Sequence, residues 1–324
     1  MVKLADAAQA EKKLATRAAF GVTLAELAAE GEPVVAVDAD LSGSTTTKKF
    51  AAAAPENADK LFNCGIAEQN MIDVAAGLAL TGHIAYTGSF AVFGTGRAYD
   101  QIRNTVCYSN LNVKICPTHA GVSVGPDGGS HQMLEDISLM RGLPNMRVLV
   151  PADYAAARAA IKLAAKTPGP VYVRMGRAAV PCVYADDVEL ELGRAYTLRE
   201  GSDVTIVACG VEIREALAAA DALAAEGISA EVIDAFSVKP LDEETITASV
   251  AKTGCCVVAE EHSVHGGLGS AVAECLARKH PAPCEFVGVK DRFGKSGEFE
   301  ELLGYFNLDA AAVAAAAKAA IARK

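Results

Sequence analysis

The sequence predicts an α/β protein with two domains, in which mainly parallel sheets are flanked by helices. Short apolar runs rich in Val, Ile and Ala recur along the 324 residues, and they alternate with Ala-rich segments of helical spacing. Strands that are apolar throughout are typical of parallel sheets whose two faces are covered by helices. With 51% hydrophobic residues, the chain is also long enough to form two cores.

The apolar runs are expected to form strands. They occupy residues 33–40, 113–119, 147–153, 170–176, 203–210, 229–236, 254–261 and 284–291. Ala-rich helical patterns lie at residues 153–166, 212–226, 243–252 and 309–324. The segment 179–202 is polar and irregular, and a new series of strands and helices follows it. We therefore assign residues 1–185 to one domain and residues 186–324 to a second.

The composition argues against several classes of protein. The formal net charge is -10 and no basic run is present, so we expect binding neither to nucleic acid nor to anionic membranes. No apolar run is long enough to span a bilayer. The nine cysteines include no CxxC pair, and we recognise no secretory leader. These features predict a cytoplasmic protein with small buried thiols.

Glu68 opens a helix whose following residues are apolar on most sides, so we expect this helix to be buried all round. Burial favours a neutral carboxyl, whereas a helix N-terminus favours a carboxylate. An acid in this position can therefore share a proton with a ligand nitrogen. The alternative is a first-turn glutamate that caps the helix or pairs with backbone amides.

Two further groups of residues could line a ligand site. Phe90 and Phe93 are one helical turn apart among glycines, and they could enclose a flat heteroaromatic ring or belong to the core. His119, Asp127 and His131 lie in a glycine-rich loop after a predicted strand. Their spacing matches neither HxxxH nor HExxH, so we expect contacts to sugar hydroxyls or phosphate and no metal site on this chain.

Taken together, the motifs resemble the C-terminal section of transketolase, which consists of the pyrimidine-binding domain and the C-terminal domain. The resemblance runs nearly end to end and preserves the order of the motifs. They are "LATRAAFGVTLAELAAEG", "DADLSGS", "GIAEQNM", "SFAVF", "THAGVSVGPDGGSHQ", "RVLVPAD", "GPVYVRMGR", "VVAEEHSVHGGLGS" and "DRFGKSGEFEELLGYFNLDA". Members of this superfamily use thiamine diphosphate, so the resemblance implies that cofactor.

The resemblance also implies a role for individual residues. Glu68 matches the glutamate that hydrogen-bonds N1' of the cofactor's aminopyrimidine and so promotes loss of the thiazolium C2 proton. The second catalytic candidate is His131. Candidates for cofactor binding are Asp40, Leu41, Glu68, Phe90 and Phe93. Gly96 stands where many transketolases have a third aromatic residue, so the aromatic pocket is either incomplete or finished by another residue.

Substrate-binding candidates follow from the same resemblance. They are Arg17, Ser44, His119, Asp127 and Arg177. All but Asp127 resemble an anchor for a sugar phosphate, in which two arginines, a hydroxyl and an imidazole converge on one dianion. Asp127 resembles a residue that contacts substrate hydroxyls. Without the resemblance, Arg17 would be read as a solvated helix charge and Arg177 as half of a salt bridge at a strand end.

One part of a complete transketolase has no counterpart in this sequence. The diphosphate-binding domain carries a GDG motif, and this chain has none. We therefore expect a split enzyme whose N-terminal subunit is a separate polypeptide that holds Mg²⁺ or Ca²⁺. Thiamine diphosphate would lie between the two subunit types, in an assembly that we expect to be a heterotetramer. This chain alone should be inactive.

The expected activity is transfer of a two-carbon ketol unit between sugar phosphates in the pentose phosphate pathway. Three alternatives remain open: half of a 1-deoxyxylulose-5-phosphate synthase, a β subunit of a 2-oxoacid dehydrogenase, and a catalytically silent partner subunit. The dehydrogenase subunit would not need the four-residue phosphate anchor. A silent subunit should have lost Glu68, which is present here.

Overall fold

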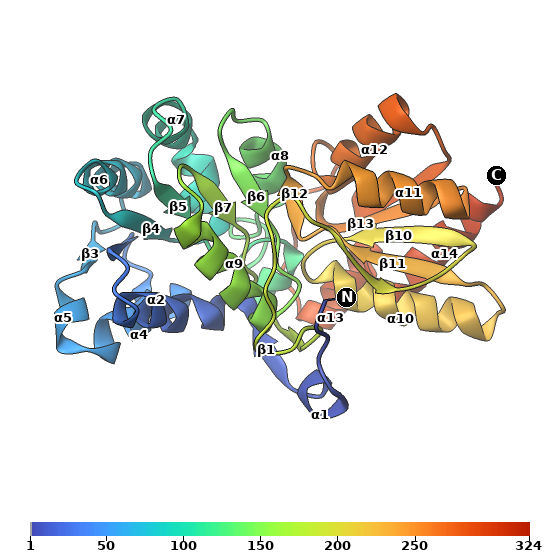
Figure 1. The fold of residues 1–324 in the computed structure, drawn as a ribbon, viewed down its shortest axis with the longest axis horizontal. Helices are drawn as coiled ribbons and strands as arrows, with labels where there is room; N and C mark the ends of the chain where they lie inside the picture. Colours follow the sequence, from blue (N-terminus) through green and yellow to red (C-terminus); the bar gives the residue numbers. More distant parts are fainter. Residues whose placement is uncertain (1) are drawn as a thin grey trace.

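A computed structural model describes residues 2–324 as two twisted sheets that lie side by side, each flanked by helices (Figure 1). The arrangement confirms the predicted α/β class with two domains and mainly parallel sheets. Each of the predicted apolar runs contains a strand. Six further strands lie outside these runs and were not predicted: β1, β3, β4, β8, β9 and β12.

The first sheet has seven strands in the order β12-β6-β7-β5-β4-β2-β3. Their bounds are β2 Val34–Asp38, β3 Leu61–Asn63, β4 Ile84–Gly88, β5 Val113–Ile115, β6 Arg147–Leu149, β7 Val171–Val173 and β12 Ser237–Lys239. All neighbours are parallel except β12, which runs antiparallel to β6. Since β12 comes from the second half of the chain, the two halves share this sheet.

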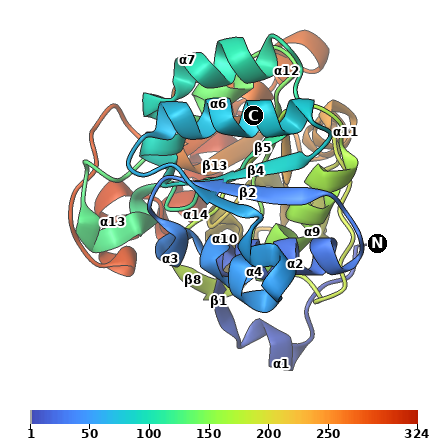
Figure 2. The same ribbon diagram turned by 90° about the vertical axis from the view of Figure 1, so that its left-hand side faces the viewer.

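Helices cover both faces of the first sheet (Figure 2). One face carries α2 Phe20–Ala29, α4 Thr47–Ala53 and α9 Tyr154–Lys166, and the other carries α6 Glu68–Leu80, α7 Tyr99–Gln101 and α8 Asp136–Arg141. Helix α9 begins where it does because Asp153 accepts a hydrogen bond from the amide of Ala156 at 2.7 Å. Shorter elements are α1 Ala7–Ala10, α3 Ser42–Thr45 and α5 Pro55–Ala58, with β1 Lys13–Ala15 paired to β8 Ala179–Pro181.

The second sheet has five strands in the order β14-β13-β10-β11-β9. Their bounds are β9 Tyr196–Arg199, β10 Val204–Ala208, β11 Ala230–Asp234, β13 Cys256–Ser263 and β14 Cys284–Val289, and only β9 is antiparallel to its neighbour. The associated helices are α10 Glu212–Ala225, α11 Glu243–Thr253, α12 Leu268–Lys279, α13 Phe299–Phe306 and α14 Ala310–Ile321. The glycines at 266–269 form a tight turn between β13 and α12.

Helix α6 corrects one expectation. It is not buried all round, because one stripe of the helix faces solvent. The exposed residues are Gln69, Asn70, Asp73, Gly77 and Leu80. The apolar residues on the other sides of α6 pack into the core beneath it. No helix within residues 2–324 has the length and apolar character needed to cross a bilayer.

Candidate active site

The candidate residues gather because they follow neighbouring parallel strands of the first sheet. Asp40 follows β2, Glu68 follows β3, Phe90 follows β4, His119 follows β5 and Arg177 follows β7. The carboxyl ends of these strands meet at one edge, where ligands of open α/β sheets bind. Fold topology therefore brings together residues that lie far apart in the sequence.

Arg17 reaches the same edge from η1, a 3₁₀ turn at Thr16–Ala19. This turn is tied to the segment after β7. The hydroxyl of Thr16 accepts a hydrogen bond from the amide of Gly176 at 2.7 Å, and the amide of Arg17 donates to the carbonyl of Gly176 at 3.4 Å. These bonds place Arg17 beside Arg177.

Glu68 is buried at the first position of α6, with a side chain that is only 1% exposed. Its Oε2 accepts a hydrogen bond from Nη1 of Arg97 at 2.8 Å. Within residues 2–324 the carboxylate makes no hydrogen bond to a backbone amide, so the capping role considered from the sequence is not observed. Its other oxygen, Oε1, is available to a ligand.

Aromatic rings extend from Glu68 toward His119. The rings of Phe90 and Phe93 are 6.2 Å apart between centroids with planes 17° apart, and the imidazole of His119 stacks on Phe90 at 3.8 Å. His131 meets the edge of Phe93 at 5.3 Å. These four rings form an aromatic site beside a buried carboxylate, which suits a flat heterocycle with a basic nitrogen.

Arg97 was missed by the sequence analysis. Its guanidinium carbon lies 4.6 Å from the centroid of Phe93. Arg97 thus lies over the aromatic site next to Gly96, the position at which many transketolases have a third aromatic residue. A signal for this contact was present in the sequence, because residues four apart on a helix face each other and arginine is the common partner of an aromatic ring.

Arg17 and Arg177 form the positive part of the site. Burial lowers the pKa of Arg17, and the nearby charge of Arg177 lowers it further. Nη1 of Arg17 donates to the carbonyl of Ser44 at 2.7 Å, and Nη1 of Arg177 donates to the carbonyl of Val124 at 2.9 Å. Neither arginine forms an ion pair with a carboxylate of residues 2–324, so both retain donors for an anion.

His119 lies between the aromatic and the positive parts of the site. Burial lowers the pKa of His119 to about 3, with further contributions from Arg17, Arg177 and His131. The ring is therefore neutral near pH 7. Its Nδ1 lies 2.7 Å from the hydroxyl of Thr118, which leaves Nε2 for a ligand.

The remaining candidates lie at the margin of the site. Asp40 is exposed in a left-handed conformation, and Leu41 is held by a 2.6 Å hydrogen bond from its amide to Asp38. Ser44 contacts Arg17 through its carbonyl and not through its hydroxyl. Asp127 is exposed at the end of η4, the 3₁₀ segment Val122–Asp127. No hydrogen bond within residues 2–324 joins Asp127 to another candidate.

Two family models match the chain in succession. They are the transketolase pyrimidine-binding domain at residues 12–183 and the transketolase C-terminal domain at residues 193–313. The chain belongs to the transketolase family. This finding confirms the resemblance that the sequence motifs indicated.

Similar proteins match the transketolase-family chain over nearly its whole length. It is 48% identical to the putative transketolase C-terminal section of Methanocaldococcus jannaschii, over 92% of this chain and 93% of that protein. It is 44% identical to the 6-deoxy-6-sulfo-D-fructose transketolase subunit of a Clostridium species, over 93% of this chain and 92% of that protein. A solved split-gene transketolase, described as an inactive β4 tetramer, superposes with a TM-score of 0.87 at 51% identity, covering 96% of this chain and 99% of that one.

The transketolase family depends on thiamine diphosphate, and the residues of this chain fit the aminopyrimidine part of that cofactor. The carboxylate of Glu68 is buried and bonds Arg97, whose guanidinium lies over the ring of Phe93. The hydroxyl of Ser89, adjacent to Phe90, is buried without a hydrogen-bond partner in the described chain. Buried polar groups of this kind are normally satisfied, and a ligand with ring nitrogens and an amino group could satisfy them.

Proposed function

We propose that this chain is the C-terminal subunit of a split transketolase. It would transfer a two-carbon ketol unit from a ketose phosphate to an aldose phosphate in the pentose phosphate pathway. The observation that carries the proposal is a buried acid, Glu68, at a sheet edge that also holds Arg17 and Arg177, neither of which pairs with a carboxylate of residues 2–324. The carboxylate of Glu68 suits the aminopyrimidine of thiamine, and the two guanidinium groups suit a phosphate.

Glu68 would hold a proton on N1' of the aminopyrimidine, because Oε1 is available and the surrounding burial strengthens the hydrogen bond. Phe90 and Phe93 would flank the ring, and Asp40 and Leu41 would approach it from the loop after β2. When bound, thiamine diphosphate supplies the nucleophilic carbon that carries the ketol unit. This chain would orient the cofactor and exclude water from its pyrimidine ring.

The sugar phosphate would be held by Arg17, Arg177, His119 and Ser44. Because His119 is neutral, Nε2 can either donate to or accept from the sugar without adding a fixed charge. Asp127 and His131 would contact substrate hydroxyls, and His131 would also lie close enough to the rings to take part in proton transfer. Two local guanidinium groups then explain how a chain with a net charge of -10 binds an anionic sugar.

The partner would be an N-terminal transketolase subunit with the diphosphate-binding domain and its Mg²⁺ or Ca²⁺. Relatives of which this chain covers 93% and 92% are described as a C-terminal section and as a subunit, which supports a divided enzyme. We place the assembly in the cytoplasm as a heterotetramer.

Reconstitution tests the proposal. The chain is mixed with the N-terminal subunit, thiamine diphosphate and Mg²⁺, and transfer from xylulose 5-phosphate to ribose 5-phosphate is followed. Glu68→Ala should leave assembly intact and lower turnover about 10²-fold or more. The control Glu56→Ala, at an exposed position, should change neither assembly nor turnover. A folded complex without ketol transfer would rule the proposal out. Activity on pyruvate would instead favour a 1-deoxyxylulose-5-phosphate synthase or 2-oxoacid dehydrogenase half.

A second substrate class deserves a parallel assay. One relative is named for 6-deoxy-6-sulfo-D-fructose, and a pair of arginines with a neutral histidine can bind a sulfonate as well as a phosphate. Fructose 6-phosphate and 6-deoxy-6-sulfofructose should therefore be compared as donors. The ratio of their kcat/KM values decides which anion the site prefers.

A further inference from the structure

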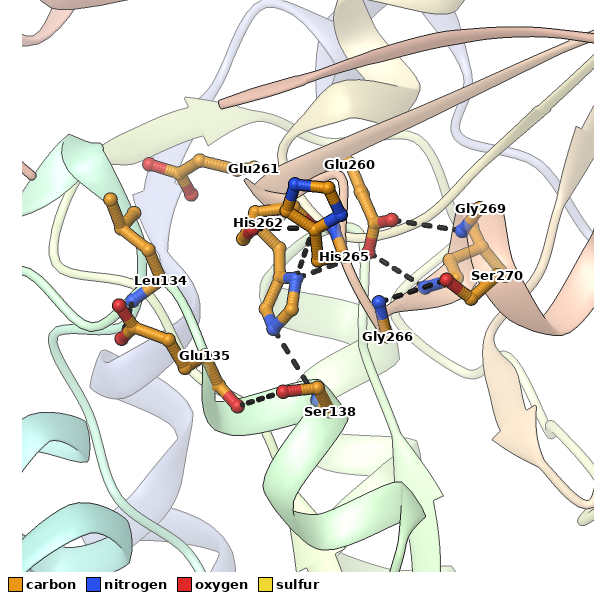
Figure 3. Close-up of polar contacts among 12 residues, drawn as sticks. Leu134, Glu135, Ser138, Glu260, Glu261, His262, His265, Gly266, Gly269 and Ser270 are labelled. Carbon is orange, nitrogen blue, oxygen red and sulfur yellow. Dashed lines mark hydrogen bonds and ion pairs between the residues drawn. The ribbon is translucent and has the colours of Figure 1, made fainter. Parts of the chain in front are cut away.

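The carboxyl end of β13, in the C-terminal domain, faces the first domain with neighbouring acids that point in different directions (Figure 3). Glu260 points into its own domain, where it accepts hydrogen bonds from the amides of Leu268 at 2.7 Å and Gly269 at 2.8 Å. Glu261 points away from Glu260, and its Oε1 accepts a hydrogen bond from the amide of Ser123 in the first domain. Glu260 therefore starts α12, whereas Glu261 reaches the candidate active site.

Ser123 belongs to the glycine-rich loop between His119 and His131. Glu261 is seated against the backbone of this loop. At Gly121, where φ is +81°, an added Cβ would lie 2.2 Å from Cδ of Glu261. A side chain at residue 121 is therefore excluded both by its backbone conformation and by the glutamate.

The loop transmits this contact to the phosphate anchor. Ser123, which donates its amide to Glu261, is followed directly by Val124, whose carbonyl accepts the 2.9 Å hydrogen bond from Nη1 of Arg177. A short peptide thus has Glu261 on one side and Arg177 on the other. Any shift of the loop toward or away from the C-terminal domain changes the direction of the Arg177 guanidinium.

The C-terminal domain holds the far end of the loop as well. Nε2 of Gln132 donates to the carbonyl of Val122 at 3.0 Å and to the carbonyl of Lys295 at 2.9 Å. A Cβ on Gly129 would come within 2.7 Å of the carbonyl oxygen of Gly294, so the two backbones are in close contact. Both ends of the loop are therefore fixed to the C-terminal domain.

Charged groups surround the carboxyl of Glu261. Arg174 donates from Nη2 to the carbonyl of Glu261 at 2.9 Å, and its Nη1 lies 3.9 Å from Oε2. Asp136 contributes negative charge from α8. Glu212 of α10 also faces this carboxyl, but burial raises the pKa of Glu212 well above its ordinary value, which favours its neutral form. Burial raises the pKa of Glu261 to about 7, although Arg174 and the amide of Ser123 oppose this effect. Arg174 and the loop amide thus support the charged form of Glu261, the stronger acceptor.

We propose that Glu261 of the C-terminal domain is a positioning residue for Arg177, and that the C-terminal domain thereby sets the affinity of the site for the phosphate of the sugar. The inference rests on the proposed function, because it takes Arg177 as part of the phosphate anchor. It gives the C-terminal domain a role beyond packing, although Glu261 itself touches no substrate.

The test uses the complex reconstituted with the N-terminal subunit and measures KM and kcat for xylulose 5-phosphate and for unphosphorylated xylulose. Glu261→Gln keeps the size of the side chain but weakens the bond to Ser123. It should raise KM for the phosphorylated donor about tenfold, the usual effect of losing a charge-assisted hydrogen bond, and leave kcat and the unphosphorylated donor unchanged. Gln132→Met, at the other end of the loop, should act in the same direction.

Two controls separate the outcomes. Glu231→Gln alters another buried acid of the C-terminal domain. Glu231 pairs with Lys252 at the opposite end of the parallel strands, so this variant should leave KM unchanged for both the phosphorylated and the unphosphorylated donor. Arg177→Ala tests the proposed function itself, because it must weaken the phosphorylated donor if the anchor is assigned correctly. If Arg177→Ala does so while Glu261→Gln and Gln132→Met do not, the positioning role is wrong and the proposed function stands. If Glu261→Gln does not fold, Gln132→Met alone decides.

Discussion

Replacing Arg97 with leucine tests whether this arginine holds the carboxylate of Glu68 in place. The side chain of Glu68 is 1% exposed and that of Arg97 is 48% exposed, and Nη1 of Arg97 lies 2.8 Å from Oε2 of Glu68. Removing one partner of a fully buried pair costs about 3–5 kcal/mol, whereas an exposed pair contributes about 0–1 kcal/mol. Because Arg97 is half exposed and also covers Phe93, we expect the free energy of unfolding to fall by about 2 kcal/mol.

The melting temperature of the isolated chain provides the assay. A loss of about 2 kcal/mol corresponds to a fall of about 4–8 °C for a domain of this size. Arg103→Leu is the matched control, since Arg103 is exposed on a neighbouring turn and, among residues 2–324, its side chain bonds only to the adjacent Asn104. An unchanged melting temperature in the Arg97 variant would refute the reasoning.

A double-mutant cycle then assigns the loss to the pair. If Arg97 stabilises the chain by compensating the carboxylate, Arg97→Leu should cost much less when Glu68 is already glutamine. We expect a coupling energy of about 1–2 kcal/mol from denaturant titrations. Additive effects, to within about 0.3 kcal/mol, would show that Arg97 acts through Phe93 alone.

Two further predictions concern titration. Burial and the charges of Arg17 and Arg177 lower the pKa of His119 to about 3, so its imidazole NMR signals should stay constant from about pH 5 to 8. A titration of these signals with a midpoint near the pKa of free histidine would contradict this. Burial raises the pKa of Asp234 from 3.8 to about 8, so the folded chain keeps a proton that the unfolded chain loses. The stability from this proton is complete below the unfolded pKa and is lost as the pH rises through about 8. In the unsubstituted chain the free energy of unfolding should fall between about pH 5 and 8, and Asp234→Asn should make this fall shallower by up to about 1.4 kcal/mol per pH unit. Denaturant titrations at several pH values measure both slopes, and equal slopes for the two chains would contradict the prediction.

Much of the fold could be predicted because buried parallel strands have a strong local signal. The apolar runs need helices on both faces, and that requirement specifies the class. Strands β3 and β12 gave no such signal, because neither lies in a long apolar run and each takes its conformation from pairing with a distant strand. Strand β4, by contrast, lies in a recognisable apolar run, Ile84–Gly88, and was predictable from the same signal.

The candidate site was predictable where its residues form motifs and unpredictable where it depends on contacts between them. Glu68, Phe90 and His119 lie in recognisable segments, and the sheet topology brings those segments together. The bond between Ser123 and Glu261 joins residues 138 positions apart, and no local pattern indicates it. The same holds for the pair of Arg97 and Glu68, because a sequence shows which residues are charged but not which charges meet.

The packing of the core explains why the second half of the chain can affect a site at the edge of the first sheet. One hydrophobic cluster runs from α2 and α9 to α10 and α14, and the other runs from α6 and α8 to α11 and α12. Strand β12 adds the second half to the first sheet next to β6. Interiors packed at this density transmit displacement instead of absorbing it. Strand β13 and the glycine-rich loop are therefore held together by packing and by the bond between Glu261 and Ser123, and we expect the position of Arg177 to depend on both halves of the chain.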